Sequence, residues 1–145
     1  MHLYRTHTCS QLRASDAGAT SRLSGWIFRV RDHGGILFID LRDHYGLTQV
    51  VIHPSRNFFE TLSRAKLESV ITVTGKVVPR EPSTINPDLP TGEIEIVADE
   101  CQIEADADQT PLYIPGDEDG SEDLRLKFRF LDLRRERIHN NILLR

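Results

Sequence analysis

Two alternating apolar segments joined by a glycine turn constrain the fold of this chain most strongly. The first runs from Leu23 to Arg31 and the second from Ile36 to Leu41, with His33, Gly34 and Gly35 in the turn. Alternation of apolar and polar residues is typical of half-buried strands, and a glycine-containing turn between two such runs is typical of a hairpin. The sequence therefore predicts two antiparallel strands that carry arginines and an aromatic ring at their polar edges.

Further β segments follow this hairpin in the order of a small barrel. We expect a third strand over Leu47 to His53, a helix from Pro54 to Leu67, a fourth strand over Val70 to Val78 and a fifth over Glu93 to Ile103. Three consecutive strands, a helix and two more strands form the order of the five-stranded OB barrel, and another small barrel with an inserted helix is the alternative. We predict a mainly β, five-stranded OB-fold barrel with a helix between strands 3 and 4, followed by an extended or helical linker.

The alternation also indicates which side chains leave the core. Three apolar residues of the second strand share one face, so Phe38 between them points to the other face. The same reasoning turns Gln49 of the third strand and Glu95 of the fifth strand outward. An outward phenylalanine on such a sheet either stacks on a base or is covered by another segment.

The first strand does not fit this simple alternation. If Leu23 and Ile27 face the core, then Arg29 and Arg31 have the same parity and would face it too. Burying two unpaired guanidinium groups is costly, so a twist or a bulge must intervene before the arginines reach solvent. Gly25 marks a point where the strand could bulge or bend.

The charge is unevenly distributed along the chain. The net charge of −4 is the sum of three blocks: residues 1–91 hold 11 basic and 8 acidic residues, residues 92–123 hold 12 acidic and no basic ones, and residues 124–145 hold 7 basic and 2 acidic ones. A protein that coats any nucleic acid needs a broad basic surface, whereas local arginines beside an acidic surface suit a protein that recognises one particular nucleic-acid structure. A solvated acidic face with a linker is the alternative explanation of the acidic block.

The sequence contains no pattern that predicts a membrane, secretory or metal-binding role. No apolar run approaches the roughly 18 to 20 residues needed to cross a bilayer, and the first residues lack the apolar core of a signal peptide. Cys9 and Cys101 lie far apart in the sequence, without the spacing of a zinc site or a disulfide framework. We therefore expect a cytoplasmic chain with structural thiols, no membrane partner and no metal site of its own.

Seven short segments spread along the chain form a recognisable pattern. They are Gly25-Trp26, Arg31 to Gly35, Phe38 to Asp43, Gly46 to Val50, Val73 to Gly75, Thr91 to Glu95 and Leu124 to Arg135. In this order they resemble the N-terminal part of bacterial-type aspartyl-tRNA synthetase, over nearly the whole chain. The related class II synthetases for lysine and asparagine share the OB domain and the last segment, but the His-Gly-Gly turn and the Thr-Gly-Glu-Ile-Glu strand fit the aspartate enzyme better.

The resemblance implies two parts of a longer enzyme. Residues 1–108 would form the anticodon-binding domain, and residues 109–145 would form a hinge, over 111–123, and the start of a catalytic domain whose remainder follows Arg145. The longer enzyme would use ATP and Mg²⁺ to activate aspartate, transfer it to the terminal adenosine of a tRNA, and act as a homodimer. The 145 residues by themselves are expected to bind no cofactor and to be non-catalytic.

The resemblance also assigns roles to individual residues in binding the tRNA anticodon loop. In the family the central uracil stacks on the residue that matches Phe38, and the residue that matches Gln49 hydrogen-bonds it. An amide suits uracil because it offers one donor and one acceptor, and a carboxylate suits guanine, so Glu95 matches an acceptor for the first anticodon base. Arginines match positions that contact the bases or phosphates of the loop: Arg29, Arg31 and Arg80. Taken alone, each of these arginines is more simply explained as a solvated surface charge.

The family divides by its choice of tRNA. Strict members charge only the aspartate tRNA, whereas relaxed members also place aspartate on the asparagine tRNA, whose anticodon differs in the third base. The loop around Ser83, which we also assign to tRNA discrimination, departs from the lysine- and asparagine-containing loop of strict members, so their base contacts do not transfer to it directly. The position that matches His33 tends to be histidine in relaxed members and leucine in strict ones. We therefore predict the relaxed type, although a histidine merely tolerated in a turn would look the same. The alternatives are a strict enzyme and a free-standing OB module that binds single-stranded nucleic acid.

Overall fold

The computed structural model describes residues 4–114 and 120–145. The chain divides into two compact units, Met1–Asp108 and Gln109–Arg145. The hinge predicted over 111–123 lies partly outside the described residues, and the assignment of the second unit to a catalytic domain stays a prediction.

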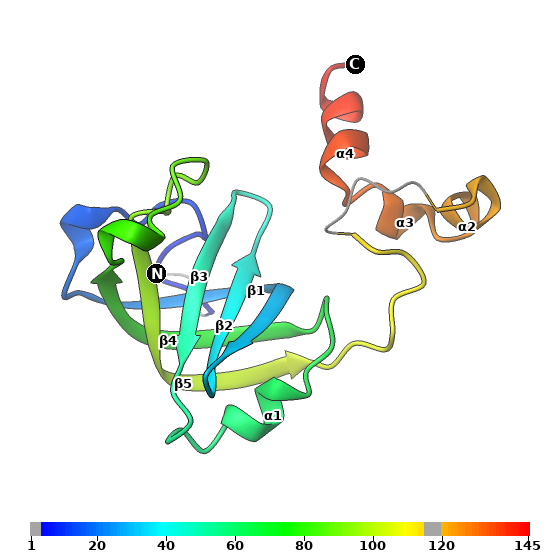
Figure 1. Cartoon of the computed structure of the whole chain (residues 1–145). Helices are drawn as coiled ribbons and strands as arrows, with labels where there is room; N and C mark the ends of the chain where they lie inside the picture. The colour runs from blue at the N-terminus through cyan, green and yellow to red at the C-terminus, as the bar shows by residue number, and fades with distance from the viewer. Residues whose placement is uncertain (1–3, 115–119) are drawn as a thin grey trace. The chain divides into compact units, whose positions relative to one another are not determined.

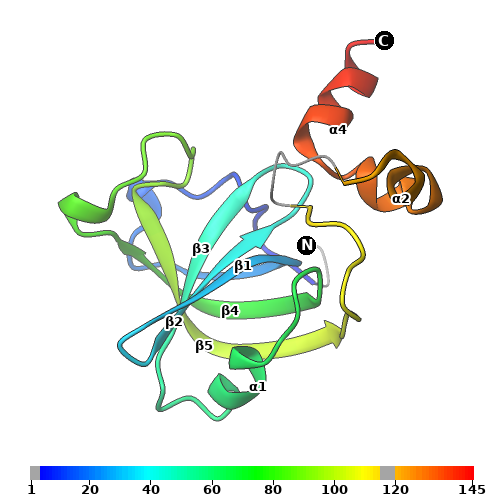
Figure 2. The same cartoon turned by 45° about the vertical axis from the view of Figure 1, so that its right-hand side comes forward.

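The first unit contains a closed five-stranded barrel with one short helix (Figures 1 and 2). Its strands pair in the order β1-β2-β3-β5-β4, and all neighbours are antiparallel except β3 and β5, which are parallel. The elements are β1 (Thr20–His33), β2 (Ile36–Arg42), β3 (Leu47–Ile52), α1 (Phe59–Ser63), β4 (Val70–Pro79) and β5 (Ile94–Ala105), with single 3-10 turns η1 (Ala14–Asp16) and η2 (Pro82–Thr84). The predicted mainly β barrel with a helix between the third and fourth strands is confirmed.

The helix is shorter than the sequence predicts. Residues 54–58 form turns rather than helix, with Arg56 N donating to the carbonyl of His53, and no side chain caps the first turn of α1. A side-chain cap stabilises a helix start, so its absence helps to explain why the regular part begins only at Phe59. Leu62 is the buried residue of α1 and joins the barrel core.

The apolar faces of the strands meet inside the barrel as their alternation predicts. Burying each such side chain stabilises the fold by about 1.5–3 kcal/mol. The residues of β2, β3 and β5 that the alternation assigns to the core are at most 2% exposed: Leu37, Ile39, Leu41, Val50, Ile52, Ile94 and Ile96.

Strand β1 changes partner part-way along its length. Its first half pairs with β4 and its second half with β2, and Trp26 pairs with both Val70 and Arg42. A Cβ atom on Gly25 would overlap the carbonyl oxygen of Arg42, so only glycine lets β1 and β2 approach this closely. Gly25 therefore marks the change of partner, while the bulge lies further along the strand.

The second unit contains three short helices over a small apolar cluster. They are α2 (Glu122–Lys127), α3 (Arg129–Asp132) and α4 (Glu136–Leu143), and Leu112, Ile114 and Leu131 form the buried cluster. In the described parts of the chain, no helix has both the length and the apolar character needed to span a membrane.

Candidate nucleic-acid interface

A row of polar side chains crosses the outer face of the barrel. Within it, Asp40 pairs across the sheet with Arg29 of β1 and with Gln49 of β3, and Glu95 pairs with Val78 of β4. We call these residues the polar row: Arg29 and Arg31 on β1, Asp40 on β2, Gln49 on β3, Glu95 on β5, and Arg80 directly after β4. The fold therefore brings six residues that are scattered over 67 sequence positions, from 29 to 95, into one band.

Hydrogen bonds link four members of the polar row. Nη2 of Arg31 donates to Oδ1 of Asp40 at 2.6 Å and to Oε1 of Gln49 at 3.3 Å. Nε2 of Gln49 in turn donates to Oε2 of Glu95 at 2.8 Å. Because an arginine can only donate and a carboxylate can only accept, these two neighbours fix which end of the Gln49 amide is the oxygen.

Gln49 is less accessible than the outward parity alone implies. It points away from the core, but it is only 7% exposed. Its hydrogen-bonded neighbours flank both ends of the amide, and among the described residues its second amide hydrogen and second oxygen lone pair have no hydrogen-bond partner.

A β-bulge turns the two arginines of β1 outward. Ile27 pairs with Leu41 and Arg29 pairs with Asp40, so Phe28 is an extra residue in β1 and the register shifts there. After the shift, Val30 packs against the barrel core, while Arg29 is exposed and Arg31 half-buried. The predicted bulge before the arginines is confirmed, three residues after Gly25.

The turn before β4 holds this bulge in place. Ile27 N donates to the carbonyl of Ser69 at 2.9 Å, and Glu68 N donates to the carbonyl of Ile27 at 2.8 Å. The guanidinium of Arg42 lies 4.9 Å from the ring centre of Phe28 and donates to the Glu68 carboxylate at 3.1 Å. Glu68 has a φ of 72°, which is uncommon for a residue other than glycine.

Phe38 lies beside the polar row and is half-buried. It pairs with Arg31 across the β1–β2 ladder. The ring of His33 approaches the Phe38 ring edge-on, with centroids 5.9 Å apart and an interplanar angle of 71°. The structure thus brings together the residue predicted to stack on the central base and the residue predicted to govern tRNA choice.

Arg80 joins the polar row from the loop after β4. Its Nε donates to the carbonyl of Ile94 at 2.9 Å, and its Nη1 donates to that of Thr84 at 3.4 Å. Burial lowers the pKa of Arg80, while the carboxylates of Glu95 and Asp40 act in the opposite direction. Ser83 is exposed in η2, and no hydrogen bond among the described residues ties its side chain to the polar row.

The sequence analysis assigned no role to Asp40. Asp40 is only 8% exposed although its position in the strand alternation is outward, and it forms the shortest hydrogen bond in the polar row. An acidic residue inside a strand, with the same parity as Phe38, was the signal that could have identified it.

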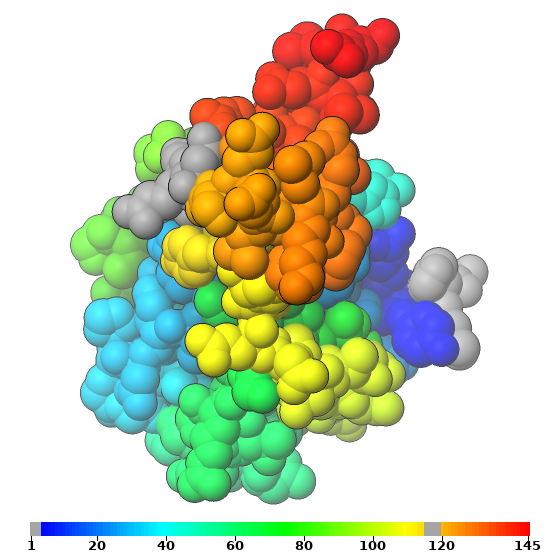
Figure 3. All heavy atoms as spheres, turned by 90° about the vertical axis from the view of Figure 1, so that its right-hand side faces the viewer, coloured from blue at the N-terminus to red at the C-terminus, as the bar shows by residue number. Residues whose placement is uncertain are grey.

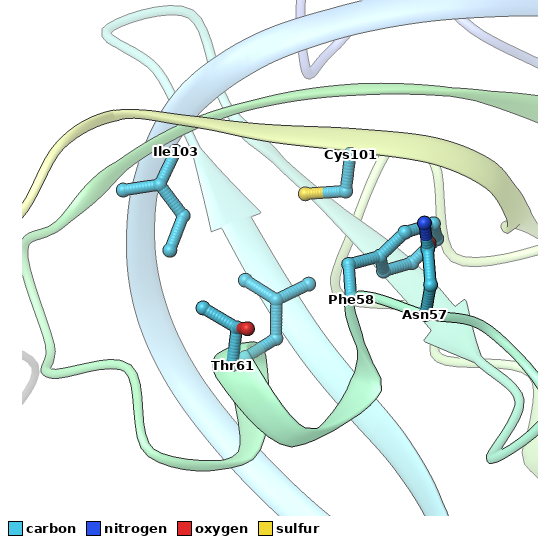
Figure 4. A pocket seen from close by; sticks show the side chains of 6 residues that line it. Asn57, Phe58, Thr61, Cys101 and Ile103 are labelled. Carbon is cyan, nitrogen blue, oxygen red and sulfur yellow. The ribbon is translucent and has the colours of Figure 1, made fainter.

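The cleft between α1 and β5 lies away from this row. It measures about 340 Å³ and is lined by Asn57, Phe58, Thr61, Leu62, Cys101 and Ile103 (Figure 4). Figure 3 shows the α1 segment, in green, beside the yellow end of β5. Burial raises the pKa of the Cys101 thiol to about 12, so this sulfur is a poor nucleophile at neutral pH.

The described residues offer no metal centre. Within 4–114 and 120–145, no three His, Cys, Asp or Glu side chains gather in a way that could hold a metal ion.

Comparison with known proteins agrees with this geometry. A family model for tRNA anticodon-binding domains, an OB-fold nucleic acid binding domain, matches residues 22–104, which include the whole polar row. The chain belongs to this OB-fold family. The matched region begins within β1 and ends within β5, so the OB-fold domain and the barrel coincide.

Relatives over the full length of the chain are aspartate–tRNA ligases. The chain is 59% identical to the aspartate–tRNA(Asp/Asn) ligase of Paramagnetospirillum magneticum and 58% identical to that of Phenylobacterium zucineum, each over all 145 residues. The resemblance to aspartyl-tRNA synthetase is thereby confirmed. The chain spans 17% of the first relative and 24% of the second.

Solved structures agree on the fold. A putative aspartyl-tRNA synthetase from Leishmania major superposes with a TM-score of 0.75 over 92% of this chain and 29% of its own, at 19% sequence identity. At this level of identity the likeness supports the fold alone.

Proposed function

We propose that the OB-fold domain binds the anticodon loop of a tRNA, as part of an aspartate–tRNA ligase that accepts both the aspartate and the asparagine tRNA. The observation that carries this proposal is the hydrogen-bonded chain Arg31–Gln49–Glu95 beside the half-buried ring of Phe38. Oriented hydrogen-bonding groups next to an aromatic ring on an OB sheet are typical of surfaces that recognise splayed, single-stranded bases. The names of the relatives support the same tRNA pair.

The central anticodon base is the one that the row suits best. Within the part of the chain that the structure describes, Gln49 keeps one amide hydrogen and one oxygen lone pair without a partner, in an order fixed by Arg31 and Glu95. Uracil presents a donor beside an acceptor on its pairing edge, so it matches this remaining pair. A base bonded in this way would stack on Phe38.

Glu95 is proposed to accept hydrogen bonds from the first anticodon base. Its Oε2 already accepts from Gln49, and its Oε1 makes no hydrogen bond in the described part of the chain. Guanine carries two adjacent N–H donors on its pairing edge, which a carboxylate can accept together. Arg29, Arg31 and Arg80 would contact the bases or phosphates on either side.

The third anticodon base is proposed to be read near His33 and Ser83. His33 is exposed at the end of β1 and touches Phe38, and Ser83 is exposed in the loop that follows Arg80. A histidine that tolerates either cytosine or uracil would allow both tRNAs. A strict enzyme that accepts only the aspartate tRNA is the alternative.

The remaining properties concern the longer protein. We propose that it activates aspartate with ATP and Mg²⁺, transfers it to the tRNA, forms a homodimer and acts in the cytoplasm. These steps require residues beyond the 145 of this chain, and the OB-fold domain would contribute the choice of tRNA.

A titration with anticodon hairpins tests the proposal. The chain is titrated by calorimetry with an RNA hairpin carrying the aspartate anticodon and with one whose central uracil is replaced by adenine. We expect clearly tighter binding of the first hairpin. Equal affinities would contradict anticodon reading and favour a module that binds single strands without choice.

Replacement of the proposed stacking ring sharpens the test. Base stacking on an aromatic ring is worth about 1–3 kcal/mol, so Phe38→Ala should weaken binding of the aspartate hairpin by roughly 5- to 150-fold. Tyr45→Ala is the matched control, because Tyr45 is 55% exposed in the loop at the opposite end of β2. An unchanged affinity for Phe38→Ala would remove the stacking role.

A further inference from the structure

We infer that Asp40 is a specificity-determining positioning residue, which orients Arg31 and Gln49 for base recognition and withholds the charge of Arg31 from phosphate. This inference rests on the proposed anticodon function and adds a residue to it. Asp40 itself need not touch the RNA, because it acts through its neighbours.

Asp40 lies at the centre of the polar row. It is flanked in register by Arg29 on one side and Gln49 on the other, and its side chain is 11% exposed. A buried carboxylate is costly unless it is paired. The 2.6 Å bond from Arg31 meets this need and ties the two side chains together.

The position of Arg31 depends on this carboxylate. Among the described residues, Arg31 is held only through Nη2, by Asp40 and, at a longer 3.3 Å, by Gln49. Its Nε is buried and has no hydrogen-bond partner there. Without a charged Asp40, the one strong contact that orients the guanidinium is lost.

The orientation of Gln49 follows from that of Arg31. An amide can rotate by half a turn and exchange its oxygen and nitrogen, and only the donors and acceptors around it decide between the two orientations. Arg31 at the oxygen end and Glu95 at the nitrogen end make one orientation favourable. If Arg31 swings away, one of these two constraints is removed.

Asp40 also limits the positive charge of the interface. The polar row contains three arginines and two carboxylates, and Asp40 acts electrostatically on Arg80 as well as on Arg31. Binding to phosphates is independent of sequence and grows with the number of unneutralised arginines. A neutralised Arg31 therefore contributes little to indiscriminate binding, so that the base contacts decide affinity.

The test compares Asp40→Asn with a matched control. Asparagine keeps the size of the side chain and removes its charge. Asp99→Asn serves as the control, because Asp99 also pairs with an arginine at 2.6 Å, with Arg56, but it is 45% exposed and lies outside the polar row. Circular dichroism first establishes that each variant is folded, and each is then titrated with the aspartate hairpin and the adenine-centred hairpin at several salt concentrations.

We expect Asp40→Asn to bind the adenine-centred hairpin more tightly than the unchanged chain does. The ratio of its affinities for the aspartate and the adenine-centred hairpins should fall about fivefold, the equivalent of one hydrogen bond. The plot of log affinity against log salt should steepen by about 0.7, the value for one additional phosphate contact on a single strand. Asp99→Asn should change neither quantity. If Asp40→Asn keeps both the discrimination ratio and the salt slope of the unchanged chain, the inference is wrong.

Two further results keep the outcomes distinct. If the unchanged chain does not discriminate between the hairpins, the proposed function fails before Asp40 is tested. If Asp40→Asn does not fold, Asp40→Glu takes its place: the charge stays but moves by one methylene, so discrimination should fall while the salt slope stays constant. Full discrimination by a folded Asp40→Glu would overturn the positioning role.

Discussion

Gly92 allows the loop after β4 to pack against the start of β5. A Cβ atom at this position would overlap the carbonyl oxygen of Asn86, lie 2.7 Å from its carbon and lie 3.0 Å from the carbonyl oxygen of Leu89. These are backbone atoms, which cannot rotate away as the end of a side chain can. We therefore predict that Gly92→Ala forces the loop to move.

The expected cost follows from the contacts that the loop would lose. Gly92 N donates to the carbonyl of Leu89 at 2.9 Å, and Asn86 N donates to the carbonyl of Gly92 at 3.1 Å. Each such bond contributes about 1 kcal/mol, and overpacking costs about 1–3 kcal/mol, so the free energy of unfolding should fall by about 2 kcal/mol. For a domain of this size that lowers Tm by roughly 8 °C.

Thermal unfolding followed by circular dichroism measures this shift. Gly120→Ala is the control for the general effect of replacing glycine by alanine, because the nearest atoms to a Cβ there are the methyl ends of Leu112, at 3.3 Å, and Leu124, at 3.9 Å. It should change stability by less than about 0.5 kcal/mol. A Gly92→Ala protein that melts within 2 °C of the unchanged chain would refute the close-approach argument.

Three other experiments have defined outcomes. Burial raises the pKa of the Cys101 thiol to about 12, so iodoacetamide should label Cys101 slowly in the folded protein at pH 8 and quickly in urea, and fast labelling of the folded protein would contradict this. Above pH 9 the thiol ionises in the unfolded chain before it does so in the folded one, so the free energy of unfolding should fall as pH rises. Glu95→Gln should weaken a hairpin with guanine at the first position more than one with adenine there, as titration of both would show. His33→Leu should reduce binding of the asparagine hairpin relative to the aspartate hairpin, and an unchanged ratio would argue against a role in tRNA choice.

The barrel could be predicted from the sequence because its core positions alternate strictly. Leu37, Ile39 and Leu41 leave a single choice of inward face for β2, and the structure buries all three. The helix between β3 and β4 was predicted too long, because its apolar spacing continues into turn residues that lack a helix cap. Apolar periodicity reports which side chains are buried, but it does not reveal where the backbone hydrogen bonds of a helix begin.

The candidate site could be predicted only in part. Parity turned Phe38, Gln49 and Glu95 away from the core, and the structure agrees with these directions, although their roles in binding stay predictions. The outward parity of an acidic residue could have drawn attention to Asp40, but the hydrogen bonds that link it to its neighbours could not be predicted. They depend on the register between β1, β2 and β3, which local sequence does not determine.

The bulge at Phe28 connects the fold to the proposed recognition of RNA. Without the extra residue, Arg29 and Arg31 would keep the parity of Ile27 and point into the core, where Ile27 is fully buried. Both the backbone N–H and the carbonyl of Ile27 bond to the turn at Glu68 and Ser69, so this distant turn fixes the residue at which the parity changes. The direction of the arginines is therefore set by the turn before β4, which lies outside the polar row. Asp40 then acts on an Arg31 that the fold has already turned outward, which separates the two requirements: the bulge brings the charge to the surface, and the carboxylate determines how that charge is used.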